Sequence, residues 1–438
     1  MGEGRLLCRE VVQDGALGRG SKNIYPYNPQ QEGARRMGSI NKNKKTLLFI
    51  SAIVGSTGDV INEWQVAMSL AKHARNVFII APVGLRYVIS REYKKYLLDR
   101  PSNTRIILLP FALLPSDFLY LMNLIIFIFY SLMIYILTLT LDMMIHFDII
   151  YVRDSRLALL LAFSPRLARK CFVKIAAILE DGIYQVLLRQ LTLMLINSID
   201  RHVLERTAGI ITHSADFAKS LVLRKKVLPK RIIVIPPGIM LNTVKIVRRI
   251  CRRKTKTENE VTVGFLGFLA PWQGVDMLCS IVAELNRLGY KAKLKVVGDG
   301  PLKRQLLKEC TKLGVPVEIT GFVSHPVALC IARRDFDVMV LPRVSTETTA
   351  TIMPIKVIEA LALGIPVVAT ELPVYESSAF REKGLYTSRR DPKAFAETIA
   401  RILRESGSDT IKLPSFDLFK PYLYDYSVKR FIEYVSEG

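Results

Sequence analysis

The segment that decides the fold is LPRVSTETTATIMPIKVIEALALGIPVVAT, residues 341–370. An apolar run ends at Leu341, and a polar loop follows it. Pro354 stands where a helix is expected to begin, because proline suits the first helical position, and Gly364 stands where the helix is expected to end. Another apolar run follows at residues 366–369. Strand, helix and strand in this order are typical of parallel sheets with crossover helices.

The same alternation of short apolar runs and longer amphipathic stretches extends over the chain from Thr46 onward. The runs predict parallel strands, and the stretches between them predict crossover helices. In the first half, strands are expected at residues 46–54, 76–81, 104–109, 148–152, 171–179, 209–212 and 231–235. In the second half, they are expected at residues 261–266, 293–297, 317–320, 336–341 and 366–369. The sequence therefore predicts an α/β fold with two doubly wound sheets.

Length and composition bound the domain organisation. The chain has 438 residues and half of them are hydrophobic, which excludes a disordered chain and allows two or three domains. We expect an N-terminal domain at residues 46–242, a C-terminal domain at residues 258–415, and a helix at residues 416–438 that packs back on the N-terminal domain. Residues 1–45 lack a hydrophobic period and predict a disordered basic tail, unless the chain starts at Met37.

A basic segment separates the two series of strands. The formal net charge of the chain is +23, and residues 243–257 contribute seven Lys and Arg residues and no acidic residue. Such a run is typical of a solvated linker. The alternative is attraction to an anionic lipid surface or to a phosphate-bearing acceptor. Nucleic acid is not expected as a partner, because no aromatic residues interleave with the run.

The cysteines are scattered and include no Cys-x-x-Cys pair, so the sequence predicts neither a disulfide framework nor a zinc site. We therefore expect a reduced, cytosolic compartment. No apolar stretch with a cleavage site opens the chain, so no secretory signal is expected. The six cysteines are Cys8, Cys171, Cys251, Cys279, Cys310 and Cys330.

Residues 118–141 form an apolar segment of 24 residues without a charge. As a helix it would measure about 36 Å, which is long enough to cross a bilayer. A crossing is disfavoured, because strands of one sheet precede and follow the segment. Two interpretations stay open: a crossover helix buried by its own domain, and a monotopic helix that dips into the membrane. On a helix its polar residues fall on one stripe, which consists of Tyr120, Asn123, Tyr130, Ser131, Tyr135, Thr138 and Asp142.

Two charged residues mark the helix expected after Pro354. Lys356 and Glu359 are three residues apart and lie on one helical face near the N-terminus. The helix dipole disfavours a cation there, and an anionic ligand between Lys356 and the free N–H groups would reverse that penalty. Glu359 is suited to accept hydrogen bonds from two vicinal hydroxyls of a ribose. The alternative is an ordinary surface ion pair.

These features resemble the donor-site signature of the retaining glycosyltransferases of family 4, which have the GT-B fold. Further segments resemble landmarks of that family in the same order along the chain. The resemblance implies two Rossmann-like domains that face a central cleft, a nucleotide-sugar as donor substrate, and neither a cofactor nor a metal ion. The further segments are residues 55–59, 234–239, 263–276, 296–302 and 321–323, which together with 341–370 cover roughly residues 46–405.

The resemblance also implies roles for particular residues. On the acceptor side it implies a glycine loop of Gly55, Ser56, Thr57 and Gly58. Glu180 and Asp181 stand at the family's Glu-x-His-Gly segment, and with Lys356 they are the expected catalytic residues; capping of the next helix is their alternative role. On the donor side, the expected residues are Glu359, Arg343, Thr351, Pro354, Ile355, Gly267, Gln273, Gly274 and His325.

The chain departs from the family pattern at three positions. Phe268 and Gln273 stand where the family usually has the Arg and Lys that hold the donor diphosphate, and Thr351 stands where it has the first glutamate of its Glu-x7-Glu signature. Arg343 and Lys356 are the available replacements for phosphate binding. His213 and His325 are also compatible with structural, hydrogen-bonded histidines, and His325 is expected to border the nucleotide pocket.

The expected function is that of a metal-independent glycosyltransferase that moves a hexosyl-type sugar, with retention, from a nucleotide-sugar to a lipid-linked or glycolipid acceptor. We expect peripheral or monotopic membrane contact at the cytoplasmic face of the cell membrane, and no nucleic acid. One alternative is a soluble enzyme that makes a small glycoside or polysaccharide. The other is a catalytically silent subunit that keeps the fold and binds a partner enzyme.

Overall fold

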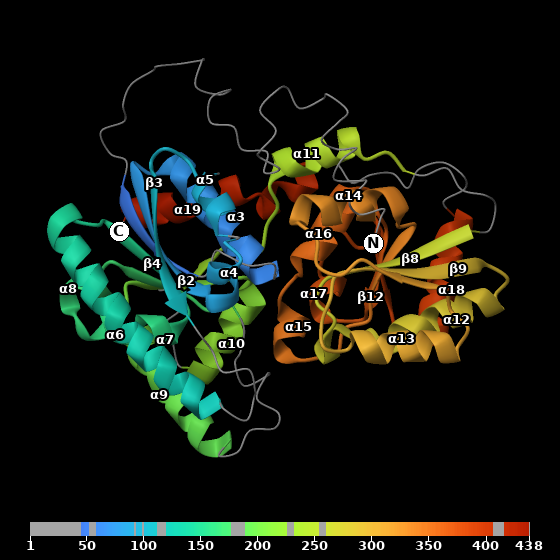
Figure 1. Ribbon diagram of the computed structural model, residues 1–438, viewed down its shortest axis with the longest axis horizontal. Helices are drawn as coiled ribbons and strands as arrows, with labels where there is room; N and C mark the ends of the chain where they lie inside the picture. Colours follow the sequence, from blue (N-terminus) through green and yellow to red (C-terminus); the bar gives the residue numbers. More distant parts are fainter. Residues whose placement is uncertain are drawn as a thin grey trace. The chain divides into compact units, whose positions relative to one another are not determined.

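The computed structural model describes residues 45–51, 58–91, 93–98, 100–111, 120–176, 189–225, 232–253, 260–405 and 416–437. These residues form two compact units (Figure 1). Within the described ranges, we call residues 45–51, 59–237 and 424–437 the N-terminal unit, and residues 238–423 the C-terminal unit. The tail expected at residues 1–45 lies outside the described residues, apart from Lys45.

The N-terminal unit contains a seven-stranded sheet with the order β3-β2-β1-β4-β5-β6-β7. Every pairing is parallel, and the chain reverses direction across the sheet between β1 and β4, which is a topological switch point. The expected doubly wound sheet is confirmed, although β1 and β5 are shorter than expected and β2 and β3 are longer. The strands are β1 (Thr46–Ile50), β2 (Asn76–Gly84), β3 (Thr104–Phe111), β4 (Ile149–Arg153), β5 (Cys171–Lys174), β6 (Gly209–Thr212) and β7 (Ile232–Val234).

Helices cover both faces of this sheet (Figure 1). Leu48, Ile50, Ile150 and Val152 are fully buried between the sheet and the helices, as expected for continuous apolar strands. The helices are α3 (Gly58–His73), α4 (Leu85–Ile89), α5 (Lys94–Leu98), α6 (Tyr120–Ile145), α7 (Ser155–Ala158), η2 (Leu161–Phe163), α8 (Pro165–Ala168), α9 (Arg189–Arg206), α10 (Ala215–Lys225) and α19 (Tyr424–Glu437).

The C-terminal unit contains a six-stranded parallel sheet with the order β10-β9-β8-β11-β12-β13. Five of its strands were expected. The edge strand β13 was not, because it is only four residues long and its middle two side chains are half-exposed. The strands are β8 (Glu260–Leu266), β9 (Lys291–Val297), β10 (Val317–Ile319), β11 (Val338–Leu341), β12 (Val367–Thr370) and β13 (Leu385–Ser388).

The helices of this unit include short turns next to the strand ends. Pro354 is the N-cap residue of α16 rather than its first helical residue, so the expected start was wrong by one position. The helices are α11 (Leu241–Ile250), η5 (Pro271–Gln273), η6 (Val275–Met277), α12 (Leu278–Arg287), α13 (Lys303–Lys312), α14 (His325–Asp335), α15 (Glu347–Thr351), α16 (Ile355–Ala362), α17 (Pro373–Glu376), α18 (Pro392–Glu405) and η7 (Phe416–Tyr422).

The basic segment 243–257 is not simply a solvated linker. Its first part lies in α11, whose Val244 and Val247 are buried in the core of the C-terminal unit. Arg253 continues the contact, because its guanidinium donates to the Gly364 carbonyl at 2.7 Å. The apolar residues three apart anchor one helical face, and the arginines occupy the other. Residues 254–257 lie outside the described residues.

The expectation of no disulfides was wrong. Cys251 is bonded to Cys330, and Cys279 to Cys310. The partners are 79 and 31 residues apart, so their proximity arises from packing of α11 on α14 and of α12 on α13, which spacing in the sequence does not show. Cys171 is a buried free thiol. The cysteine pattern therefore no longer supports the expectation of a reduced compartment.

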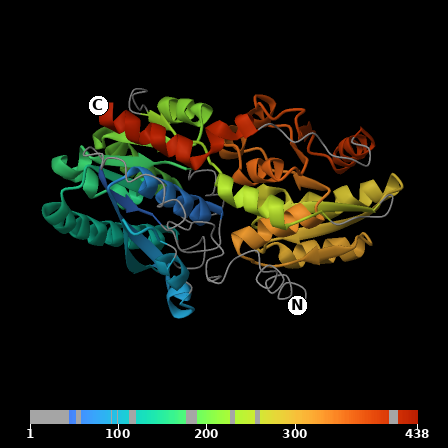
Figure 2. The ribbon, with the colours of Figure 1, turned by 90° about the horizontal axis from the view of Figure 1, so that it is seen from above.

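The C-terminal helix α19 packs within the N-terminal unit (Figures 1 and 2). Ser69 Oγ donates to Asp425 at 2.7 Å, and Lys72 Nζ pairs with the same carboxylate at 2.8 Å. Phe431 is buried, and its ring lies 5.4 Å from that of Phe172 of β5. Residues at the end of the chain thus complete the core of its first half.

Candidate active site

The donor-side residues expected from the sequence gather at the carboxyl edge of the C-terminal sheet. The apolar face of α16, with Val357, Ile358 and Leu361, is buried against that sheet. This fixes the helix with its N-terminus at the edge, where β8 and β11 end. Ligands of doubly wound sheets bind at such edges, and a helix N-terminus favours an anion.

Lys356 projects from the first turn of α16 toward the end of β8. Its Nζ donates to Gln273 Oε1 at 3.3 Å and lies 5.1 Å from the centroid of the Phe265 ring. Burial and, to a lesser extent, the Arg343 charge lower the pKa of Lys356, Glu359 opposes both effects, and the net pKa is about 7. Near neutral pH this amine is therefore close to the midpoint of its titration. A bound diphosphate would favour its charged form.

Gly267 and Gly274 provide room for this arrangement. Gly267 has a φ of +135°, and a Cβ atom there would collide with Lys356 Nζ. Gly274 has a φ of +74°, and a Cβ atom there would collide with the Pro342 carbonyl oxygen. These two glycines act through conformation and clearance, rather than through side-chain contacts.

Glu359 is buried one turn further along α16 and is paired with His325. His325 Nε2 lies 2.6 Å from Glu359 Oε1. Burial acts to lower the pKa of His325, but the charge and hydrogen bond of Glu359 outweigh it, so the pKa is raised. The expected carboxylate acceptor is present, with one oxygen engaged by His325. Oε2 is the oxygen that remains to receive a ligand hydroxyl.

The other expected donor-side residues surround this pair. Arg343 follows β11, and its Nε is buried without a hydrogen-bond partner among the described residues. Thr351 Oγ1 donates to the Glu347 carbonyl at 2.7 Å, so its proton is committed to α15. Pro354 and Ile355 form the start of α16, where the first N–H groups of a helix lack carbonyl partners within it.

Three exposed aromatic rings line the same edge. Phe268 follows β8, Trp272 lies in η5, and Phe322 follows β10. The Phe268 ring centroid lies 6.5 Å from that of Trp272 and 6.5 Å from that of Phe322. We call these three residues the aromatic shelf. In the sequence, Phe268 was noted only because it replaces the arginine usual in the family. The grouping of the three rings was not predicted, although all three follow the ends of strands.

The expected acceptor-side residues cannot be placed in the same way. Gly58 begins α3. Gly55, Ser56, Thr57, Glu180 and Asp181 lie outside the described residues.

The described part of the N-terminal sheet edge holds a buried polar cluster that the sequence did not reveal. Glu63 of α3 accepts from Lys174 Nζ at 2.6 Å and from Tyr151 Oη at 3.1 Å. Arg153 at the end of β4 lies 3.8 Å from the same carboxylate.

His213 Nδ1 lies 3.3 Å from the Ile235 carbonyl. Burial, together with the Lys174 charge, holds the pKa of His213 well below its usual range, which agrees with a structural histidine.

Comparison with solved structures defines the class of fold. The chain superposes on sucrose-phosphate synthase from Thermosynechococcus elongatus with a TM-score of 0.67, at 15% identity over 90% of this chain and 99% of that one. It also superposes on HepE from Anabaena in complex with UDP, with a TM-score of 0.63, at 15% identity over 90% of this chain and all of that one. The two parallel-sheet units together have the GT-B fold.

The match to a known family lies in the C-terminal unit. Residues 260–405 match the family described as glycosyl transferases group 1. The chain is 27% identical to the GDP-mannose-dependent alpha-(1-6)-phosphatidylinositol dimannoside mannosyltransferase of Mycobacterium tuberculosis. This alignment of 175 residues covers 39% of this chain and 43% of that protein. The chain is 29% identical over 185 residues to the D-inositol 3-phosphate glycosyltransferase of Segniliparus rotundus, over 40% of each chain.

The matched regions thus span less than half of these curated relatives. Residues 260–405 thus match the group 1 glycosyltransferases, and the fold is GT-B, as the sequence resemblance implied. The narrower assignment to family 4 stays a prediction.

Proposed function

We propose that this protein is a retaining, metal-independent glycosyltransferase that moves a hexosyl-type sugar from a nucleotide-sugar to a lipid-linked or glycolipid acceptor. The observation that carries the proposal is the placement of Lys356, Arg343 and Glu359 around the N-terminus of α16, within the group 1 domain. Two cations and a helix N-terminus suit a diphosphate, and a buried carboxylate suits a ribose.

The donor interactions follow from this geometry. Glu359 Oε2 would accept a hydrogen bond from a ribose hydroxyl while His325 fixes Oε1. Lys356 and Arg343 would face the diphosphate and stabilise its negative charge as it leaves, which is the role that a divalent cation has in other transferases. The aromatic shelf offers ring faces for stacking on the donor.

On the acceptor side, Glu180 and Asp181 are the proposed groups that contact the reacting hydroxyl, with the loop of Gly55, Ser56, Thr57 and Gly58 beside them. The Mycobacterium tuberculosis relative is named for a phosphatidylinositol dimannoside acceptor. That name, and the long apolar helix α6, support a membrane-bound acceptor here. We place the protein at the cytoplasmic face of the membrane, in peripheral or monotopic contact with it.

The experiment is a binding and transfer assay on the purified protein. UDP-, GDP- and ADP-sugars are tested for thermal stabilisation, which ligand binding to the folded state produces. Transfer to a polyprenyl-phosphate sugar is then measured with and without EDTA, and the anomer of the product is read by NMR. We expect stabilisation by one nucleotide class, EDTA-resistant transfer and a retained anomer. An inverted product would contradict the mechanism.

Specific variants separate the two sides of the site. Glu359→Gln should weaken donor binding roughly 10- to 100-fold, the worth of a hydrogen bond to a charged group. Asp181→Asn should leave donor binding unchanged and reduce transfer. Loss of fold stability in Asp181→Asn would instead support the helix-cap role.

The silent-subunit alternative is favoured by one observation, namely that Phe268 and Gln273 replace the usual basic residues. If this alternative holds, no nucleotide-sugar should raise the thermal stability of the protein. The soluble-enzyme alternative expects transfer to a water-soluble sugar at least as fast as to the lipid-linked one.

A further inference from the structure

Helix α6 has the reverse polarity of a helix on a water-soluble surface. Its inward face contains Ser131, Thr138 and Asp142, all fully buried. Its outward face contains large apolar side chains, with exposed fractions from 43% to 76%. The predicted polar stripe therefore points into the protein at these three residues. The outward residues are Ile125, Ile128, Phe129, Leu132, Ile136, Met143 and Met144.

This exposed surface extends beyond α6. α7 contacts both α6 and α9. Phe163 of η2 is 62% exposed, and its ring centroid lies 3.9 Å from that of His202 of α9. The first half of α9 adds the exposed side chains of Leu191, Met194 and Leu195. We call these four residues, together with the seven outward residues of α6, the apolar face.

The ends of α6 decide how it meets a membrane. The helix connects β3 to β4, two strands of one sheet, and its buried residues recur along its length. Among the described residues, α6 is the one helix that is long and apolar enough to cross a bilayer. A crossing would pull the buried Asp142 and Ser131 away from their partners in the same unit. The geometry permits an orientation parallel to the membrane plane.

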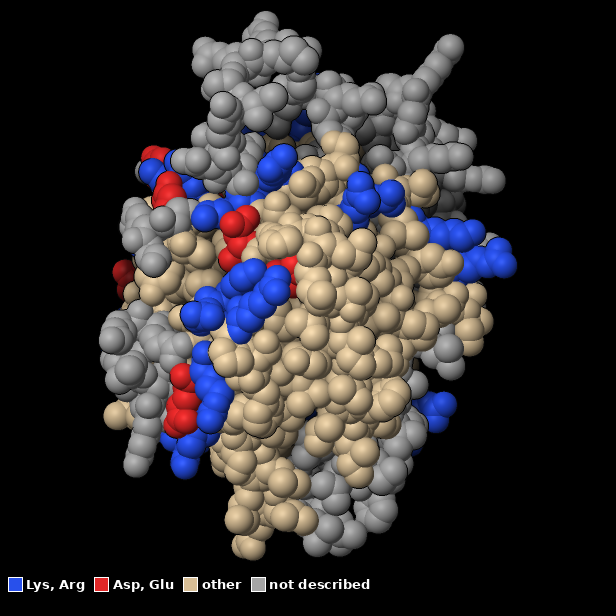
Figure 3. Space-filling view, turned by 90° about the vertical axis from the view of Figure 1, so that its left-hand side faces the viewer, with Lys and Arg blue, Asp and Glu red and all other residues tan. Residues whose placement is uncertain are grey.

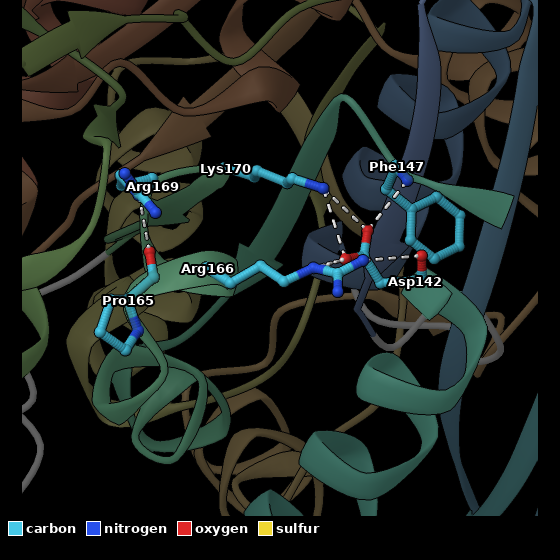
Figure 4. Close-up of polar contacts among 6 residues, drawn as sticks. All are labelled: Asp142, Phe147, Pro165, Arg166, Arg169 and Lys170. Carbon is cyan, nitrogen blue, oxygen red and sulfur yellow. Dashed lines mark hydrogen bonds and ion pairs between the residues drawn. The ribbon is translucent and has the colours of Figure 1, made fainter. Parts of the chain in front are cut away.

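A basic cluster stands at the C-terminal end of α6 (Figure 4). Asp142 accepts from Arg166 Nε at 2.9 Å and from Lys170 Nζ at 3.0 Å. Arg169 lies beside them, and its Nε donates to the Pro165 carbonyl at 3.1 Å. Two of these cations, Arg166 and Lys170, share the single carboxylate of Asp142, and Arg169 adds a third positive charge, which leaves an excess of positive charge. We call Arg166, Arg169 and Lys170 the basic rim. Nearby, Lys45 and Asp148 form a pair that cancels its own charge.

Figure 3 shows the side of the N-terminal unit where α6 and α8 lie in Figure 1. A broad surface without charged residues occupies its middle and lower part, and Lys and Arg, with fewer Asp and Glu among them, gather along its upper and lateral borders. Apolar surface next to cations matches the layering of a bilayer, in which acyl chains lie beneath anionic phosphate groups.

We propose that the apolar face lies in the plane of an anionic bilayer, at the boundary of headgroups and acyl chains, with the basic rim on lipid phosphates. This inference deepens the proposed function by naming the surface that brings the enzyme to a membrane-bound acceptor. A second copy of the chain fits this surface less well, because α6 carries no acidic residue besides the buried Asp142 to complement the rim.

The test is co-flotation of the purified protein with phosphatidylcholine vesicles and with vesicles containing phosphatidylglycerol. Wild type should bind the anionic vesicles more strongly. Phe129→Glu with Ile136→Glu should weaken binding to both at least tenfold, since a charge would enter the apolar layer. Arg169→Glu should weaken binding only to anionic vesicles, by roughly 5- to 25-fold for a two-unit change of charge.

Matched controls keep the result interpretable. Leu223→Glu introduces one such charge at an exposed leucine of α10 outside the apolar face, and should leave vesicle binding unchanged. In Phe129→Trp, the fluorescence of the introduced tryptophan should be quenched more by lipids brominated near the headgroups than by lipids brominated at the bilayer centre. The reverse order would show a crossing helix and overturn the in-plane arrangement.

Full vesicle binding by Phe129→Glu with Ile136→Glu would also overturn the proposal. So would a concentration-dependent dimer that these substitutions abolish, without vesicle binding, since a second copy would then cover the face. Donor stabilisation is read on the same variants and should stay at the wild-type value. Absence of donor stabilisation in the wild type would contradict the proposed function and leave the vesicle result standing.

Discussion

His325 Nε2 lies 2.6 Å from Glu359 Oε1, so the carboxylate expected to bind ribose already has a buried partner. The two residues come from α14 and α16, which are in contact. Glu359 is therefore held in one orientation before a donor arrives. Such positioning reduces the entropy lost on binding.

This pair should make stability depend on pH. The pKa of His325 is raised in the folded protein, so its contribution is fully present below its unfolded value, roughly 6.5, and is lost as the pH rises through the folded value. His325→Ala should lower the free energy of unfolding by about 1–3 kcal/mol at pH 6 and by less at pH 9. Urea unfolding at both pH values measures this. A pH-independent loss would show that packing, rather than charge, is what His325 supplies.

Lys356 should make donor affinity depend on pH. Its pKa is about 7 in the free protein, and a bound diphosphate would raise it. Affinity should therefore be flat below pH 7 and should fall above it, by up to about tenfold per pH unit, until the pH passes the raised value in the complex. Calorimetry in buffers of different ionisation enthalpy should show proton uptake at pH 8.

Lys356→Met serves as the control for this dependence. It should bind the donor weakly and without the fall above pH 7. A nucleotide-sugar is the proper ligand for both proteins, because its diphosphate diester does not titrate in this range. An unchanged pH profile in Lys356→Met would assign the dependence to another group.

Gly267 and Gly289 allow backbone strain to be separated from collision. Both have positive φ, but a Cβ atom at Gly267 would meet Lys356 Nζ, whereas one at Gly289 would meet nothing within 4 Å. Each Gly→Ala change should cost about 1–3 kcal/mol of unfolding free energy. Only Gly267→Ala should also weaken donor binding, because it displaces the amine. Equal donor affinity in both variants would remove Lys356 from the diphosphate site.

The sequence predicted the sheets well because each strand is a short apolar run bounded by polar residues. It missed β13, in which only two of the four residues are buried. It also predicted the one-sided polarity of α6, but the direction of that polarity depends on what packs against the helix. Buried Asp142 is held by residues of α8 and the turn after it, which follow about 25 positions later in the sequence.

At the site, the family resemblance predicted that Lys356, Glu359, Gln273, Gly267 and Gly274 belong to one site, and the structure places Gln273 and Gly267 beside Lys356. The link between His325 and Glu359 was not predicted, because 34 residues and one strand separate the two in sequence. The aromatic shelf was missed for a similar reason. Its three rings come from two separate strand ends and meet only after β8, β9 and β10 pair.

The two disulfides should stabilise the C-terminal unit specifically. They close loops of 79 and 31 residues, and loop-closure entropy assigns each about 3–5 kcal/mol. Reduction should lower the unfolding midpoint, and Cys279→Ala with Cys310→Ala should reproduce part of that loss without reductant. Donor affinity at 25 °C should stay at the wild-type value, because neither disulfide touches Lys356, Arg343 or Glu359.

Mass spectrometry of protein alkylated in intact cells then shows whether the four cysteines are disulfide-bonded in the cell. Two results together would contradict the prediction: alkylation of all four cysteines, and an unfolding midpoint that reductant does not change. The pairs would then be closely packed thiols that stabilise the fold only through their buried surface.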